Sequence, residues 1–186
     1  MPPEIIRDAK ARVAAVKEDN EIPPLKAVEE LSWCILVLER TTERFALAQA
    51  LQIRGMAHAC GMEDHPRAFR DWRRALKIVV GSPKKSPKFL RLAGRIRFQM
   101  GLHADGPARI RYYNQALRLF REAGWREGEA SVIVHRGLEW TERGERRKAL
   151  SDLEAGLTIA RERKMGAIRQ LKGFIRAAEN LSEPPI

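Results

Sequence analysis

A spacing of about 40 residues recurs along the chain and constrains its fold more than any other feature. Four columns of residues repeat, in steps of 41, 41 and 40 positions. The columns are Ala27, Ala68, Arg109 and Ala149; Leu31, Trp72, Tyr113 and Leu153; Cys34, Ala75, Ala116 and Gly156; and Ile35, Leu76, Leu117 and Leu157. Because residues three and four positions apart share one face of a helix, each copy predicts a helix that packs closely against a neighbour.

The stretch from residue 137 to residue 159 predicts what each copy contains. Small and large apolar residues occur there at the spacing of two short antiparallel helices, joined by a tight turn at Gly144. A lone helical hairpin cannot bury its own apolar face, whereas a stacked series can. The recurrence therefore predicts an all-α chain built as an array of about four helical hairpins.

These residues resemble the tetratricopeptide repeat family over roughly residues 24 to 163. In the last copy the family's signature positions hold Gly137, Trp140, Gly144, Ala149, Leu153 and Gly156. The period is near 40 residues, as in the longer-helix members, and two positions depart from the pattern: Arg109 replaces a small residue and Arg97 an aromatic one. The resemblance implies a right-handed superhelical array with a C-terminal capping helix, and protein recognition as the function.

The expected organisation is one domain over residues 1–186. It comprises a degenerate N-terminal hairpin over 1–41, three clearer repeats over 43–164 and a capping helix over 165–181. The helices are expected at about 3–19, 24–40, 43–60, 66–80, 87–101, 107–123, 126–143, 145–164 and 166–181. In the second of these helices, Leu25 is expected to face inward with Val28, Leu31, Ile35 and Leu38.

Composition argues against a membrane-spanning or disulfide-stabilised protein. The 186 residues contain no run of about 18 apolar residues, and the first ten residues contain no signal-peptide segment. Two cysteines, Cys34 and Cys60, give no disulfide framework. We therefore expect a cytoplasmic protein.

No catalytic or metal-binding motif occurs in the sequence. The four histidines are expected in different hairpins, with no cysteine or carboxylate at ligand spacing: His58, His65, His103 and His135. No glycine-rich phosphate loop follows a strand. We expect no enzyme, no cofactor and no bound metal.

The positive charge is concentrated in the middle third of the chain. The total is +11, and residues 64–126 carry 16 basic and 4 acidic side chains, which gives +12 there. Lys88, Arg91 and Arg95 follow at i, i+3 and i+7, so they share one helical face, and no acidic residue is near them in sequence. The basic residues on two second helices are interpreted as solvated faces: Arg70, Arg73, Arg74 and Lys77, and Arg111, Arg118 and Arg121.

The resemblance implies that partners bind the concave wall formed by the first helix of each pair. Mapped residue by residue, the wall positions that we expect to bind a partner are Gln52, Met56, Lys88, Arg91, Arg95, Gln99, Val134 and Leu138. Lys84 and Lys85, just before the third pair, are expected to contribute as well.

Three functions compete at this stage. The first is a non-enzymatic adaptor that binds an acidic peptide or the acidic surface of a partner protein. The second is a sequence-tolerant nucleic-acid binder, in which the basic middle third neutralises phosphates and Tyr112 or Phe98 stacks on bases. The third is a module that assembles with copies of itself or with a larger complex.

Overall fold

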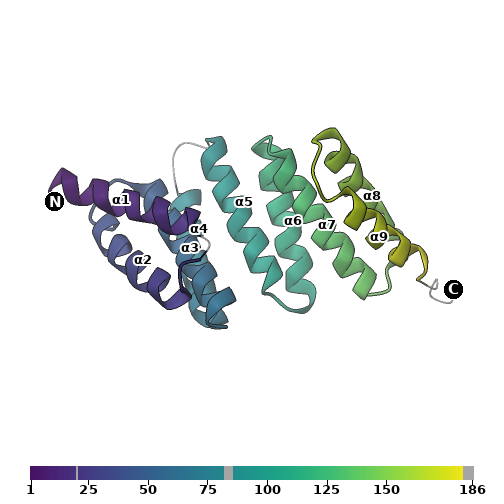
Figure 1. Cartoon of the computed structure of the whole chain (residues 1–186), viewed down its shortest axis with the longest axis horizontal. Helices are drawn as coiled ribbons and strands as arrows, with labels where there is room; N and C mark the ends of the chain where they lie inside the picture. Colours follow the sequence, from purple (N-terminus) through teal and green to yellow (C-terminus); the bar gives the residue numbers. More distant parts are fainter. Residues whose placement is uncertain (20, 82–85, 182–186) are drawn as a thin grey trace.

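The computed structural model describes residues 1–19, 21–81 and 86–181, which form helices and no strand. The α-helices are α1 (Pro3–Glu18), α2 (Pro24–Leu38), α3 (Arg44–Met56), α4 (His65–Val80), α5 (Pro87–Leu102), α6 (Gly106–Glu122), α7 (Arg126–Glu142), α8 (Arg146–Glu162) and α9 (Ile168–Glu179). They follow one another in chain order along an elongated body, with the two termini at opposite ends (Figure 1). The expected all-α array of helical hairpins is confirmed.

The helices form two walls. Consecutive helices pair as α1 with α2, α3 with α4, α5 with α6 and α7 with α8, and α9 packs on α8. The odd-numbered helices also approach one another from hairpin to hairpin, with Cα atoms within 8 Å, whereas the backbones of the described even-numbered helices stay farther apart and meet through side chains such as Phe69 and Tyr112. Because the wall with the closer neighbours lies inside a curve, the odd-helix wall (α1, α3, α5, α7, α9) is the concave one. The even-helix face (α2, α4, α6, α8) is convex.

The helix boundaries agree with the sequence expectation except after α3. There the chain continues through a π-helical turn, η1 (Ala57–Gly61), before α4 begins. A β-carbon at Gly61 would lie 2.2 Å from the Pro24 side chain, so the turn meets the start of α2 at a residue that must be glycine. None of the helices in the described part of the chain combines the length and apolarity needed to cross a membrane.

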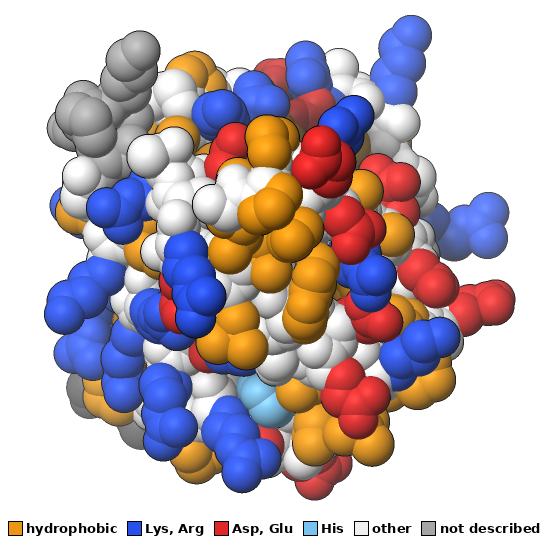
Figure 2. Space-filling view, turned by 90° about the vertical axis from the view of Figure 1, so that its left-hand side faces the viewer, with side chains coloured by type: hydrophobic (Ala, Val, Ile, Leu, Met, Phe, Trp, Pro, Cys, Tyr) orange, Lys and Arg blue, Asp and Glu red, His pale blue; other side chains and the backbone are white. Residues whose placement is uncertain are grey.

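The outer side of α2 is the first correction. Leu25 was expected to face inward, but it is 59% exposed, and Trp33 and Leu36 of the same helix are also exposed. Seen from the N-terminal end of the array, hydrophobic side chains gather in the middle of the face, beside a column of basic side chains (Figure 2). Leu25 occupies an exposed position of the repeat, because Pro66, Pro107 and Arg147, which follow it in steps of 41, 41 and 40 residues, are exposed as well.

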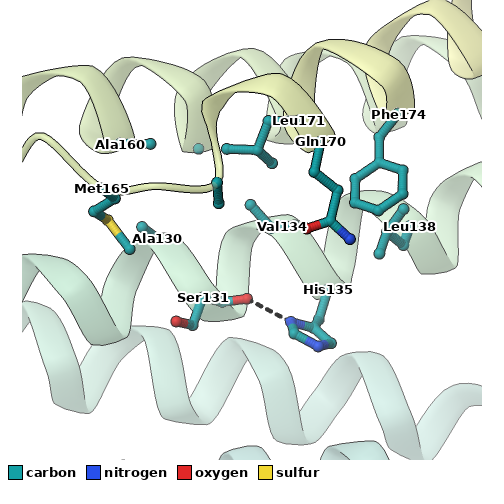
Figure 3. Close-up of a pocket in the computed structure, with 12 residues that line it drawn as sticks. Ala130, Ser131, Val134, His135, Leu138, Ala160, Met165, Gln170, Leu171 and Phe174 are labelled. Carbon is teal, nitrogen blue, oxygen red and sulfur yellow. Dashed lines mark hydrogen bonds between the residues drawn. The ribbon is translucent and has the colours of Figure 1, made fainter.

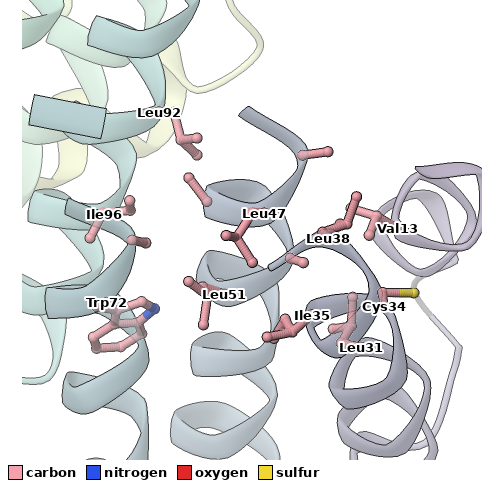
Figure 4. Close-up of a cluster of buried hydrophobic side chains, with 14 of the residues drawn as sticks. Val13, Leu31, Cys34, Ile35, Leu38, Leu47, Leu51, Trp72, Leu92 and Ile96 are labelled. Carbon is pink, nitrogen blue, oxygen red and sulfur yellow. The ribbon is translucent and has the colours of Figure 1, made fainter. Parts of the chain in front are cut away.

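Aromatic side chains that pack directly on glycines hold the α3–α4 and α5–α6 hairpins together. The Trp72 ring lies on Gly55 and its Nε1 donates a hydrogen bond to the Gln52 carbonyl oxygen over 3.2 Å. In the next hairpin, Phe120 lies on Gly94 in the same way. Around Trp72, buried side chains of α1 to α5 form a continuous layer (Figure 4).

An Arg–carboxylate pair recurs inside the hairpins and was not expected from the sequence. The arginine comes from the first helix and the acid from the second, three positions after the first column of the repeat: Arg12 with Glu30, Arg54 with Asp71, and Arg136 with Asp152. The last two are bidentate, at 2.6–2.8 Å. In the α5–α6 hairpin the corresponding residues are Ala93 and Tyr112, so this pair is absent there.

Replacing Gly94 by Ala should destabilise the fold. The added β-carbon would lie 2.3 Å from the buried Phe120 ring, and overpacking of this kind costs about 1–3 kcal/mol. Gly173 in α9 has no neighbour within 4 Å of its β-carbon position, so Gly173→Ala should stabilise by about 0.5–1 kcal/mol. Urea unfolding of both variants measures the two shifts, and shifts of the same sign would contradict the packing described here.

Replacing Asp71 by Asn should cost about 3 kcal/mol, because Arg54 would then be held in a largely buried position without a carboxylate. The double replacement Arg54→Met with Asp71→Leu should recover most of this loss, since no charge is left buried. Asp8→Asn is the control, because its pair with Arg12 is exposed and such pairs contribute about 1 kcal/mol or less. Equal unfolding free energies for Asp71→Asn and Asp8→Asn would show that burial of the Arg54–Asp71 pair has no effect.

Candidate partner-binding wall

The basic row of α5 lies on the odd-helix wall, between α3 and α7. Lys88 reaches back to α3, where its Nζ lies 5.0 Å from the centre of the Phe45 ring. Arg95 reaches forward, and its Cζ lies 4.9 Å from the centre of the Trp125 ring, directly before α7. The row thus spans the width of the wall between two neighbouring hairpins.

These cations are exposed and are not neutralised by direct ion pairs. Lys88, Arg91 and Arg95 take part in none of the ion pairs found between described residues. Arg91 acts at longer range on Glu127. The pKa of Glu127 is lowered by a hydrogen bond from its own backbone, by Arg163 and, less strongly, by the charge of Arg91. Lys84 and Lys85, which were also assigned to this site, lie outside the described residues.

Two glutamines connect α3 with α5 at the other end of the row. Gln52 Nε2 donates to Gln99 Oε1 over 3.0 Å and lies 3.1 Å from the sulfur of Met56. Gln52 itself is only 6% exposed, whereas Met56 is 39% exposed. The structure therefore brings all three predicted residues together, with Met56 and Gln99 towards the solvent and Gln52 beneath them as a positioning residue.

A pocket of about 240 Å³ opens between α7 and α9 on the same wall (Figure 3). Val134 and Leu138, the two apolar residues assigned to this wall from the sequence, both line it. Opposite them lie Gln170, Leu171 and Phe174 of α9. The sequence analysis missed the α9 residues because it treated the last helix as a cap only. Their i, i+1 and i+4 spacing places them on one helical face, which was the available signal.

His135 forms the polar edge of this pocket. Its Nδ1 lies 2.8 Å from the Ser131 carbonyl oxygen, so Nδ1 is the protonated nitrogen of the neutral ring and Nε2 is an acceptor. The ring also packs edge-on against Phe98 of α5, with 5.0 Å between ring centres. The pocket is therefore mainly apolar and has a single imidazole at its rim, and this imidazole contacts the helix that carries the basic row.

Two histidines expected in separate hairpins meet in the structure. The rings of His65, at the start of α4, and His103, at the end of α5, have centres 5.2 Å apart, and Cys60 Sγ lies 3.6 Å from His103 Nε2. Burial, and then the nearby His65, lower the pKa of His103. Within residues 1–19, 21–81 and 86–181, no three His, Cys, Asp or Glu side chains are arranged to hold a metal ion.

Comparison with models of known protein families and with curated protein sequences gives no match for this chain. Among solved structures it is similar to BtubC (BKLC) from P. vanneervenii, with a TM-score of 0.51 and 15% sequence identity. The likeness covers 95% of this chain and 86% of BtubC. At this identity it supports the helical array alone.

Proposed function

We propose that the chain is a non-enzymatic adaptor of the tetratricopeptide repeat type, which binds an acidic peptide segment of a partner protein on its odd-helix wall. The observation that carries this proposal is the presence, on one wall, of an uncompensated basic row and an apolar pocket. Lys88, Arg91 and Arg95 supply the charge, and Val134, Leu138 and Phe174 supply the apolar surface.

The size of the pocket favours a side chain over a separate small molecule. Small-molecule sites usually measure about 300–1,000 Å³, and this pocket measures about 240 Å³. An apolar side chain of a bound peptide would fill it, while acidic residues of the same peptide reach the guanidinium groups of α5. Guanidinium binds carboxylate in a bidentate manner, which fixes the direction of the peptide across α5, α7 and α9.

Two further features are consistent with this proposal. The resemblance to the tetratricopeptide repeat family rests on residues that pack as the repeat requires, such as Gly137 against Leu153. Cys34 and Cys60 are both free, as is usual in a reducing compartment, and this supports a cytoplasmic location as part of the proposal.

Selection from a library of displayed random peptides tests the adaptor function. We expect selected peptides to share an acidic segment and one large apolar residue. Arg91→Glu combined with Arg95→Glu should weaken a selected peptide at least about tenfold, which corresponds to about 1.4 kcal/mol. Leu138→Asp should weaken it comparably, because it places a charge in the apolar pocket. Fluorescence anisotropy with a labelled peptide measures both effects.

The matched control is Lys172→Glu with Arg176→Glu, the same charge reversal on the outer side of α9, where both side chains are exposed. It should leave peptide affinity within about twofold, since exposed charges distant from the site are screened by salt. The proposal is wrong if no peptide is enriched, or if the selected peptides bind the Arg91/Arg95 variant as tightly as the wild type while its circular dichroism shows an intact fold.

A further inference from the structure

The α5–α6 hairpin lacks the carboxylate that the other hairpins carry. The residue that replaces it belongs to α6, a helix of the even-helix face. Where the other hairpins have Glu30, Asp71 and Asp152, this hairpin has Tyr112. Where the last hairpin has Trp140, it has Arg97. The arginine thus stays on the first helix, one turn further along than Arg136, while the aromatic residue lies on the second helix at the position of the acid.

Arg97 and Tyr112 are in contact in the structure. The guanidinium carbon of Arg97 lies 5.8 Å from the centre of the Tyr112 ring, and that of Arg111 lies 5.9 Å from the same ring. Burial lowers the pKa of Arg97, Tyr112 acts in the opposite direction and the charge of Arg118 lowers it further. Arg97 is thus a half-buried cation with another cation, and no carboxylate, among the groups that shift its pKa.

The neighbouring hairpin extends this basic surface. Phe69 of α4 lies 6.3 Å from Tyr112 of α6, centre to centre, and Arg73 lies over Phe69 at 5.8 Å. Arg70 and Arg73 border a hollow on α4, and Arg111 and Arg118 border one on α6. None of these four arginines, nor Arg97, takes part in an ion pair between described residues. We call this surface the α4–α6 groove, made of Phe69, Arg70, Arg73, Arg97, Arg111, Tyr112 and Arg118.

We propose that the α4–α6 groove binds single-stranded nucleic acid, with its arginines on successive phosphates and its two aromatic rings beside the bases. This site lies on the opposite wall from the peptide site and is independent of it. It also revises the sequence interpretation of Arg70, Arg73, Arg111 and Arg118 as solvated faces only.

Two observations favour nucleic acid over an acidic peptide in this groove. Its cations alternate with aromatic rings, and base stacking on aromatic rings or on guanidinium planes is the usual sequence-tolerant contact to single strands. A carboxylate chain could pair with the arginines but has no bases to lie beside Phe69 and Tyr112. A duplex would be a poorer ligand, because its bases are not available for stacking on Phe69 and Tyr112.

Fluorescence anisotropy with a labelled oligouridine of about 16 nucleotides tests this proposal at 50 and 200 mM salt. We expect binding that weakens steeply with salt. Replacing Arg73 and Arg118 by Gln should reduce affinity about tenfold or more. It should also make the slope of log K against log salt less steep by about 0.7 for each phosphate that the variant no longer neutralises. Both residues are exposed, so the fold should persist.

A second variant tests the repeat argument directly. Ala93→Arg with Tyr112→Asp installs the ion pair of the Arg54–Asp71 hairpin in this one. Because the installed pair is neutral and the Tyr112 ring is lost, this variant should weaken oligouridine binding several-fold. Should this variant fail to fold, Tyr112→Leu keeps the apolar volume without the ring. In that variant we expect a several-fold reduction in affinity at an unchanged salt slope, because the stacking surface is removed and the charges remain.

The matched control is Lys172→Gln with Arg176→Gln on α9, which removes the same charge away from the α4–α6 groove and should change oligouridine affinity less than twofold. Three outcomes would overturn the proposal. They are no binding at 50 mM salt, equal binding by the Arg73/Arg118 variant, and equal competition by an oligoglutamate of matched charge. The last outcome would show that the groove recognises carboxylate chains in place of nucleic acid.

Discussion

The close approach of a large side chain to a glycine backbone is the interaction on which the three hairpins from α3 to α8 depend. Trp72 on Gly55 and Phe120 on Gly94 bring the two helices of a hairpin together at distances that a β-carbon would not permit. The α3–α4 and α5–α6 hairpins are thereby closely packed pairs, and Gly137 against Leu153 plays the same part in α7–α8; the pairs then stack through the odd-numbered helices. Both proposed sites are surfaces of this stack, so their geometry follows from the glycine contacts and not from the loops.

Both walls carry cations that are not balanced by an ion pair between described residues. Within the hairpins, Arg–carboxylate pairs neutralise the arginines of the first helices, as with Arg54 and Asp71. On the odd-helix wall, the α5 cations lack such pairs and lie over aromatic rings. On the even-helix face, the replacement of an acid by Tyr112 has a comparable effect. The excess charge of the middle third is thus divided between two surfaces that face in opposite directions.

The fold was predictable from the sequence because packing contacts recur at a fixed spacing. The same alignment, continued three positions past its first column, would also have shown Glu30, Asp71, Tyr112 and Asp152. Other features could not be found in this way. The α7–α9 pocket joins a repeat to a helix outside the repeat, and the η1 turn depends on one contact between Gly61 and Pro24. Arg109 breaks its column because it bonds to Glu139 of the next hairpin, a contact that spacing alone does not contain.

The asymmetry between the walls also determines how the array can deform. From hairpin to hairpin, the backbones of the odd-numbered helices lie close together, and those of the described even-numbered helices lie farther apart. When such an array bends, the closely packed odd-helix wall changes least. Bending therefore changes the separation of α4 and α6 far more than that of α5 and α7. The convex surface is therefore the compliant side of the molecule, and the concave surface keeps its dimensions as the curvature varies.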